Sequence, residues 1–216
     1  MGRQWRDRDA SGDRATKHRL AEMDSSLVRL DAGSGRLTGQ RRLQDRRLGL
    51  RHLALFRGST AGSTGQSAMN AGMKIGIALQ AEHDDADARR SAPVLATWDR
   101  AGGLRPVPLP AGIALAGYGG SIAALEDGFA VTCPKAGKVA RWRLSAGGPH
   151  WRDAPELPEA CAVAAGWIAG VGTVLRTVGT RPPQRWQLAA SLRLDNHWAA
   201  AGVGRSGVAG AGADHG

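Results

Sequence analysis

One tripeptide pattern occurs three times in this chain, as His52-Leu53-Ala54, Ser121-Ile122-Ala123 and Ala162-Val163-Ala164. Each copy places an aliphatic residue before an alanine, which is typical of a short strand packed among close neighbours. The second and third copies begin 41 residues apart. A strand-rich repeat with a period of about forty residues indicates the blades of a β-propeller.

Alternating strands accompany the tripeptides. Hydrophobic and polar residues alternate, as in strands with one buried face, over Leu27 to Asp31, Val94 to Asp99 and Val139 to Leu144. Trp98 and Trp142 occupy equivalent positions 44 residues apart, and we expect the seven tryptophans of the chain to lie in the blade core. The first two tripeptides begin 69 residues apart. We assign the excess to two loops, a Gly/Ser/Thr-rich one at 58–72 and an acidic one at 82–87.

The repeat predicts an all-β fold, a partial β-propeller with four-stranded antiparallel blades. About three blades are present, fewer than the roughly four to eight of a closed propeller. A hairpin at 26–40 would be the outer half of a blade whose inner strands lie upstream of Met1. We divide the chain into a polar, disordered segment at 1–25, the partial propeller at 26–198, and a Gly/Ala-rich disordered tail at 199–216.

The charge of the chain is concentrated near its N-terminus. The formal net charge is +10, and residues 1–60 carry most of the excess. The pairs Arg41-Arg42 and Arg46-Arg47 could contact phosphates, but charged residues also protect the edge of a sheet, and we expect this second role. Aromatic residues do not interleave with these arginines, so we predict no nucleic-acid partner.

The cysteines and the distribution of apolar residues give information about the cellular location of the protein. Cys133 and Cys161 show no metal-ligand spacing, and we expect buried free thiols. A disulfide between them stays open if the chain works in an oxidising compartment. There is no apolar run long enough to cross a bilayer. Charged residues occupy the place of a signal peptide after Met1, so the chain is cytoplasmic if this start is genuine.

Several strings occur in an order that resembles a known family: Ser26-Leu27-Val28-Arg29-Leu30-Asp31, Arg51-His52-Leu53-Ala54, Tyr118-Gly119-Gly120-Ser121-Ile122-Ala123, Val131-Thr132-Cys133-Pro134 and Asp195-Asn196-His197. The chain resembles the C-terminal part of domain-of-unknown-function family fifteen-thirteen from about Gly12 to His197. The resemblance implies an uncharacterised bacterial protein with a seven-bladed propeller, so that about three of seven blades are present in this chain. It also implies export to the periplasm and genes placed near imelysin-like iron-uptake proteins. This chain departs from the family pattern by lacking an export signal and the early blades.

Propeller geometry selects the candidate site residues. Inner strands begin near one mouth of the axial channel, where ligands commonly meet the loops. We therefore expect Arg51, His52, Tyr118 and Ser121 to meet there, with His52 as the best candidate for a ligand or metal contact. A second candidate is His197, which could equally close the ring. His83 with Asp84, Asp85 and Asp87 offers oxygen ligands for a hard cation, but we expect a solvated acidic loop.

The chain carries no motif of a known catalytic class. Our first hypothesis is therefore a non-enzymatic binding or scaffold module of the bacterial cell envelope, associated with iron acquisition through the resemblance. It would bind an unknown protein or small-molecule ligand, and no cofactor is assigned. One alternative is a metal-binding protein or metal-dependent enzyme that uses histidines at the channel mouth. Another is a truncated propeller fragment without independent function.

Overall fold

The structure is a computed structural model that describes residues 20–57, 73–164, 166–176, 182–189, 191, 192, 194 and 198. The Gly/Ser/Thr-rich loop predicted at 58–72 and the tail predicted at 199–216 lie outside these residues, as does most of the polar segment predicted at 1–25. The last residues of this polar segment include the 3₁₀ turn η1 (Leu20–Glu22) and the buried residue Ser25.

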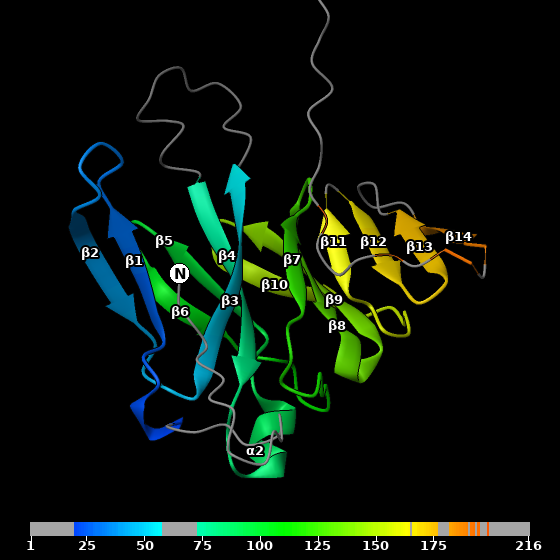
Figure 1. Ribbon diagram of the computed structural model, residues 1–216, viewed down its shortest axis with the longest axis horizontal. Helices are drawn as coiled ribbons and strands as arrows, with labels where there is room; N and C mark the ends of the chain where they lie inside the picture. The colour runs from blue at the N-terminus through cyan, green and yellow to red at the C-terminus, as the bar shows by residue number, and fades with distance from the viewer. Residues whose placement is uncertain are drawn as a thin grey trace, which may run out of the picture.

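Strands dominate the described residues and form four sheets (Figure 1). The hairpin sheet contains β1 (Ser26–Leu30) and β2 (Leu37–Arg42). The first four-stranded sheet contains β3 (Leu48–Arg57), β4 (Met73–Ala81), β5 (Leu95–Asp99) and β6 (Gly103–Val107). The second contains β7 (Ser121–Ala124), β8 (Gly128–Cys133), β9 (Lys138–Ser145) and β10 (Gly148–Asp153). The third contains β11 (Ala162–Ala164), β12 (Trp167–Gly170), β13 (Thr173–Arg176) and β14 (Gln184–Gln187).

Each four-stranded sheet is antiparallel, and its strands are hydrogen-bonded in the order of the sequence. The three tripeptides fall in β3, β7 and β11, the first strand of each sheet. β7 contacts both β3 and β11, and Figure 1 shows the three strands side by side. The predicted all-β fold with four-stranded antiparallel sheets is confirmed. The 69-residue interval holds a single sheet, β3–β6, so its excess length lies in the connections between strands.

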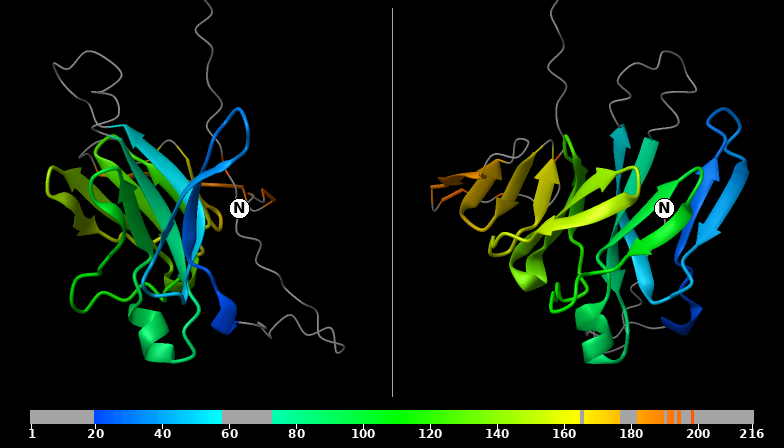
Figure 2. Two further views of the ribbon diagram at one scale, coloured as in Figure 1. Left: turned by 90° about the vertical axis from the view of Figure 1, so that its left-hand side faces the viewer. Right: turned by 180° about the vertical axis from the view of Figure 1, so that it is seen from behind.

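The sheets pack face to face, and Figure 2 shows them in sequence order across the molecule. Three apolar clusters fill the spaces between neighbouring sheets. Leu48 and Ile77 lie between the hairpin sheet and the first sheet, and Phe129 and Trp142 between the first and second sheets. Leu157 belongs to the cluster between the second and third sheets. Every sheet therefore depends on its neighbour for the burial of an apolar face.

Two predictions need correction. The acidic segment is no simple loop, because Asp85 caps a short helix, α2 (Ala86–Ser91). Trp142 is fully buried, but Trp167 and Trp186 are exposed on the third sheet, where their rings lie 5.3 Å apart. The tryptophans therefore do not all lie in the core. None of the helices in the described part of the chain is long and apolar enough to span a bilayer.

Candidate functional site

A bulge in β3 presents two of the predicted site residues. Leu50 pairs with Leu79 and Leu53 pairs with Ile77, so that Arg51 and His52 together oppose the single residue Ala78. An extra residue in one strand bends it and redirects its side chains, and such bulges are frequent beside binding sites. Arg51 and His52 are both half-buried.

A series of hydrogen-bonded side chains connects this bulge to buried polar residues. The Arg51 guanidinium donates a hydrogen bond from Nη1 to Oε1 of Gln80. The Gln80 amide in turn donates from Nε2 to Oε1 of Glu82, over 2.6 Å. Gln80 and Glu82 are both buried, and a buried amide between two charged groups fixes their orientation. The guanidinium of Arg51 is thus held in place by β4.

The Tyr118 ring lies beside two cations. The Arg51 Cζ atom is 5.9 Å from the ring centroid, and Lys135 Nζ is 4.8 Å from it. Both distances are within the range of a cation–π interaction. Lys135 belongs to the short 3₁₀ turn η2 (Pro134–Ala136), which follows β8. Two segments, β3 and η2, therefore converge on one aromatic ring.

The residues after Tyr118 hold its ring against the first sheet. Tyr118 forms an isolated β-bridge with Gln80, and the Gly119 N–H donates to the Leu79 carbonyl over 2.8 Å. A Cβ on Gly119 would lie 2.9 Å from that carbonyl oxygen and 3.0 Å from the Val94 oxygen. A side chain does not fit there, so glycine permits the close approach that brings Tyr118 to Arg51.

The predicted site is assembled in part. Arg51 and Tyr118 meet, and His52 is the other residue of the same bulge. Ser121 is buried, and its backbone N–H donates to Thr132 Oγ1 over 2.8 Å, so it joins β7 to β8. His197 lies outside the described residues. Sequence reasoning missed three residues of the site. Gln80 lies in β4 and Glu82 directly follows this strand, and both are buried. Lys135 directly follows the string Val131-Thr132-Cys133-Pro134.

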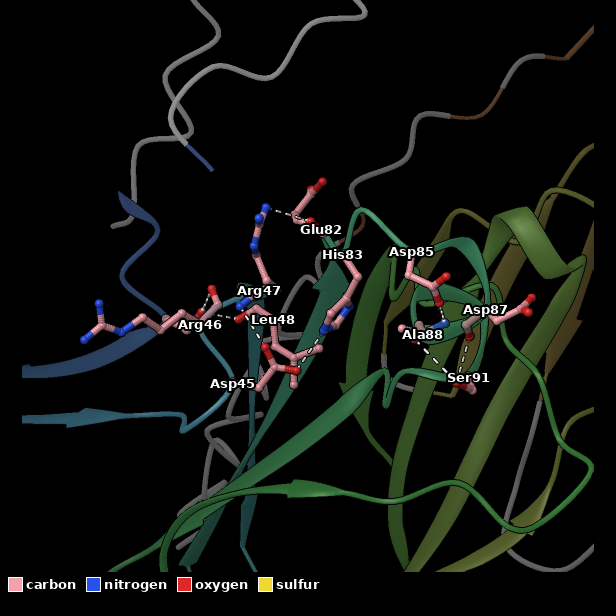
Figure 3. A network of polar contacts seen from close by, with 11 residues as sticks. Asp45, Arg46, Arg47, Leu48, Glu82, His83, Asp85, Asp87, Ala88 and Ser91 are labelled. Atoms are coloured by element: carbon pink, nitrogen blue, oxygen red, sulfur yellow. Dashed lines mark hydrogen bonds and ion pairs between the residues drawn. The ribbon is translucent and has the colours of Figure 1, made fainter. Parts of the chain in front are cut away.

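The acidic segment has partners within the protein (Figure 3). Asp85 accepts from the Ala88 N–H and caps α2, while His83 Nε2 lies 2.9 Å from Asp45 Oδ2. Asp87 pairs with Arg90 and Asp84 pairs with Arg47. No group of three or more His, Cys, Asp or Glu among the described residues is placed to hold a metal ion.

One arginine of each basic pair of the N-terminal region also has a partner elsewhere in the chain. Arg42 Nε lies 2.9 Å from Asp24 Oδ1, and Arg47 Nη1 donates to the Glu82 carbonyl over 3.2 Å. These contacts tie the hairpin sheet and the start of β3 to neighbouring segments.

The two cysteines are free thiols. Burial raises the pKa of Cys133 to about 12, so its thiol stays protonated at neutral pH. Cys161 is half-buried, and its Sγ lies 3.6 Å from the Ala169 carbonyl oxygen. A protonated, buried thiol such as Cys133 is unreactive.

Comparison with known proteins gives a family and one distant structure. A family model described as "Protein of unknown function (DUF1513)" matches residues 9–201. A functionally unknown protein from Desulfotomaculum acetoxidans shows 9% sequence identity and a TM-score of 0.46 over 77% of this chain. The chain spans about half of that protein, 51% of its length. A comparison with curated proteins found no match.

Proposed function

This chain belongs to the family described as Protein of unknown function (DUF1513), and we propose that it is a non-enzymatic binding module, a partial β-propeller that holds an anionic ligand beside Tyr118. The propeller assignment is supported by successive four-stranded antiparallel sheets whose first strands lie side by side. The binding assignment is supported by the polar groups gathered at the Arg51 bulge.

The observation that carries this proposal is the convergence of Arg51 and Lys135 on one ring. Arg51 is anchored by Gln80, which limits the conformational entropy that its guanidinium loses when it binds a ligand. A guanidinium offers a planar pair of donors that matches a carboxylate or a phosphate, and an ammonium adds a point charge. The Tyr118 ring supplies a flat apolar surface beside both.

The chemistry of these groups favours binding over catalysis. Arginine stays protonated at all physiological pH values and cannot act as a general base. Lys135 is exposed, so burial does not prepare its amine for nucleophilic attack. A cationic pair next to an aromatic ring holds an anion without transferring a proton.

The test is calorimetric titration of the purified chain with citrate, succinate and inorganic phosphate. We expect at least one of them to bind, and we expect Arg51→Gln and Lys135→Gln each to weaken the affinity about tenfold, the loss of one charge-assisted contact. Arg105→Gln is the matched control, because Arg105 is exposed on β6 and its replacement removes the same charge. Equal weakening by the control, or no binding of any of the anions, would contradict the proposal.

We also propose that this module works in the periplasm and takes part in iron acquisition. The resemblance described above supports both points. Fractionation of the native host, with the chromosomal gene tagged at its 3′ end, tests the location, since a periplasmic protein is released by osmotic shock. A deletion strain that grows as well as its parent under iron limitation would contradict the link to iron.

A further inference from the structure

Glu82 is a buried acidic residue next to the Tyr118 site. It directly follows β4 and is 6% exposed. Its main chain is fixed to the residue that precedes β3. The Glu82 N–H donates to the Arg47 carbonyl over 2.8 Å, and Arg47 Nη1 donates to the Glu82 carbonyl over 3.2 Å. The Glu82 carboxylate therefore extends from a backbone that is held in place independently of the site.

The Glu82 carboxylate determines which end of the Gln80 amide faces it. Gln80 Nε2 donates a hydrogen bond to Glu82 Oε1 over 2.6 Å. An ionised carboxylate only accepts hydrogen bonds, whereas an amide donates from its NH2 end and accepts at its oxygen. The NH2 end of Gln80 therefore faces Glu82, and the amide oxygen points the other way, where it accepts from Arg51 Nη1.

The reversed amide would not hold Arg51. A guanidinium only donates hydrogen bonds, so an NH2 group placed against it would repel it. Hydrogen bonds to charged groups are also stronger than those between neutral groups, and successive bonds in a chain polarise one another. Glu82 thus sets the direction of the Gln80 amide and strengthens the contact of this amide with Arg51.

The other two groups of the site are held by different contacts. Tyr118 meets Gln80 through a β-bridge, which is a contact of the main chain and does not involve the side-chain amide. Lys135 belongs to η2 and lies 4.8 Å from the centroid of the tyrosine ring. A change at Glu82 should therefore act on Arg51 and leave Tyr118 and Lys135 in place.

We propose that Glu82 is a positioning residue of this site, which holds the Arg51 guanidinium ready for an anion by way of the Gln80 amide. The inference rests on the proposed function, because it concerns the affinity for the ligand described there. It reverses the ordinary effect of charge. The loss of a negative side chain near an anion site normally tightens binding, but the loss of Glu82 should weaken it.

Calorimetric titration of the purified full chain with citrate, succinate and inorganic phosphate tests this sign. We expect Glu82→Gln to weaken binding about threefold to tenfold, because the ligand must then order a guanidinium that is no longer held. Asp87→Asn is the matched control, since Asp87 is 86% exposed and its replacement removes the same charge. The control should bind at least as tightly as the unmodified chain. Unchanged or tighter binding by Glu82→Gln, or an equal loss in the control, would overturn the proposal.

Two further comparisons separate the contact from the charge. Glu82→Asp keeps the carboxylate but shortens the side chain by one methylene, which withdraws it from the Gln80 amide, and we expect it to weaken binding as well. In a chain that carries Glu82→Gln, Arg51→Gln should cost less affinity than in the unmodified chain, whereas Lys135→Gln should cost the same in both. Full additivity of Glu82→Gln and Arg51→Gln would contradict an action of Glu82 through Arg51.

Nuclear magnetic resonance of the ligand-free chain measures the link between Glu82 and Arg51 without any anion. We expect slow rotation of the Arg51 guanidinium, and we expect Glu82→Gln to accelerate it while Asp87→Asn leaves it unchanged. An Arg51 signal that does not respond to Glu82→Gln would overturn the proposal even if an anion binds. If no anion binds and the Arg51 signal responds, the proposed function fails, but the positioning of Arg51 by Glu82 is supported.

Discussion

Gly76 shows how closely the first and second sheets approach each other. A Cβ at this position would lie 2.7 Å from two ring carbons of Phe129 and 2.9 Å from Cδ1 of Ile122. Phe129 is fully buried, so its ring has little room to withdraw. We expect Gly76→Ala to lower the free energy of unfolding by about 1–3 kcal/mol, the usual cost of overpacking, as measured by urea denaturation.

Gly49→Ala is the control for this substitution. Gly49 lies in β3 of the same sheet, but a Cβ there would come no closer than 3.5 Å to another atom. We expect a change within about 0.5 kcal/mol. Equal effects of the two variants would show that the contact with Phe129 does not determine the cost.

The ion pair of Asp99 makes part of the stability depend on pH. Lys74 Nζ lies 2.7 Å from Asp99 Oδ2, and each side chain is 25% exposed. The hydrogen bond from Lys74 holds the pKa of Asp99 below its ordinary value of 3.8. A lowered pKa in the folded state means that this stabilisation is present above pH 3.8 and is lost as the pH falls through the folded-state pKa.

We therefore expect Lys74→Met to reduce the free energy of unfolding by about 1 kcal/mol at pH 7, as for a partly exposed ion pair. The difference between the variant and the unmodified chain should shrink as the pH falls below 3.8 and through the lower folded-state pKa of Asp99. Urea denaturation at pH 7, 5 and 3 measures it. A difference that persists unchanged at pH 3 would assign the effect to packing of the lysine stem.

At the scale of elements, the sequence predicts those strands in which buried and exposed side chains follow a regular pattern. The alternation around Trp98 and Trp142 corresponds to β5 and β9, and the tripeptides correspond to β3, β7 and β11. These strands face a neighbouring sheet, so their side chains alternate between core and surface or remain small. The packing of one sheet on another requires this pattern of apolar and polar residues, so the pattern predicts these strands.

The elements that the sequence did not reveal lack such packing. α2 has no buried residue, so it shows no apolar periodicity. All four residues of β14 are exposed, and nothing in its sequence alternates. The site was predictable only where a residue lay in a repeat position, such as Arg51 or Tyr118. Gln80 and Lys135 join it through contacts with Arg51 and Tyr118, which are distant in sequence, and no local pattern encodes such contacts.

The cap of α2 provides a prediction for this element. Asp85 accepts a hydrogen bond from the Ala88 N–H, and a six-residue helix without buried residues depends on such a contact. We expect Asp85→Ala to cost about 1 kcal/mol of local stability. Faster hydrogen exchange at Arg89, whose N–H donates to the Asp85 carbonyl, with unchanged exchange in β4, would report it. Unchanged exchange at Arg89 would contradict this role of the cap.

At the scale of the whole molecule, the sheets form a linear series in which each contacts its sequence neighbours. The apolar clusters lie between successive sheets. In such arrays stability is close to a sum of the units and the interfaces between neighbours. A cavity at one interface should therefore weaken the two sheets that share it more than the others.

Leu115 and Leu157 allow this expectation to be tested with matched substitutions. Both are fully buried, and each lies in the connection that precedes the first strand of a sheet. Leu115 fills the cluster between the first and second sheets, and Leu157 the cluster between the second and third. Replacement of either by alanine should cost about 2–5 kcal/mol.

The two variants should differ in where the loss appears. Under native conditions, we expect Leu157→Ala to accelerate hydrogen exchange mainly in β7–β13, because the second and third sheets share this cluster. Leu115→Ala should accelerate it mainly in β3–β10, in the first and second sheets. Uniform acceleration by both variants would instead mean that the sheets unfold as one cooperative unit, in which the interfaces transmit every loss across the molecule.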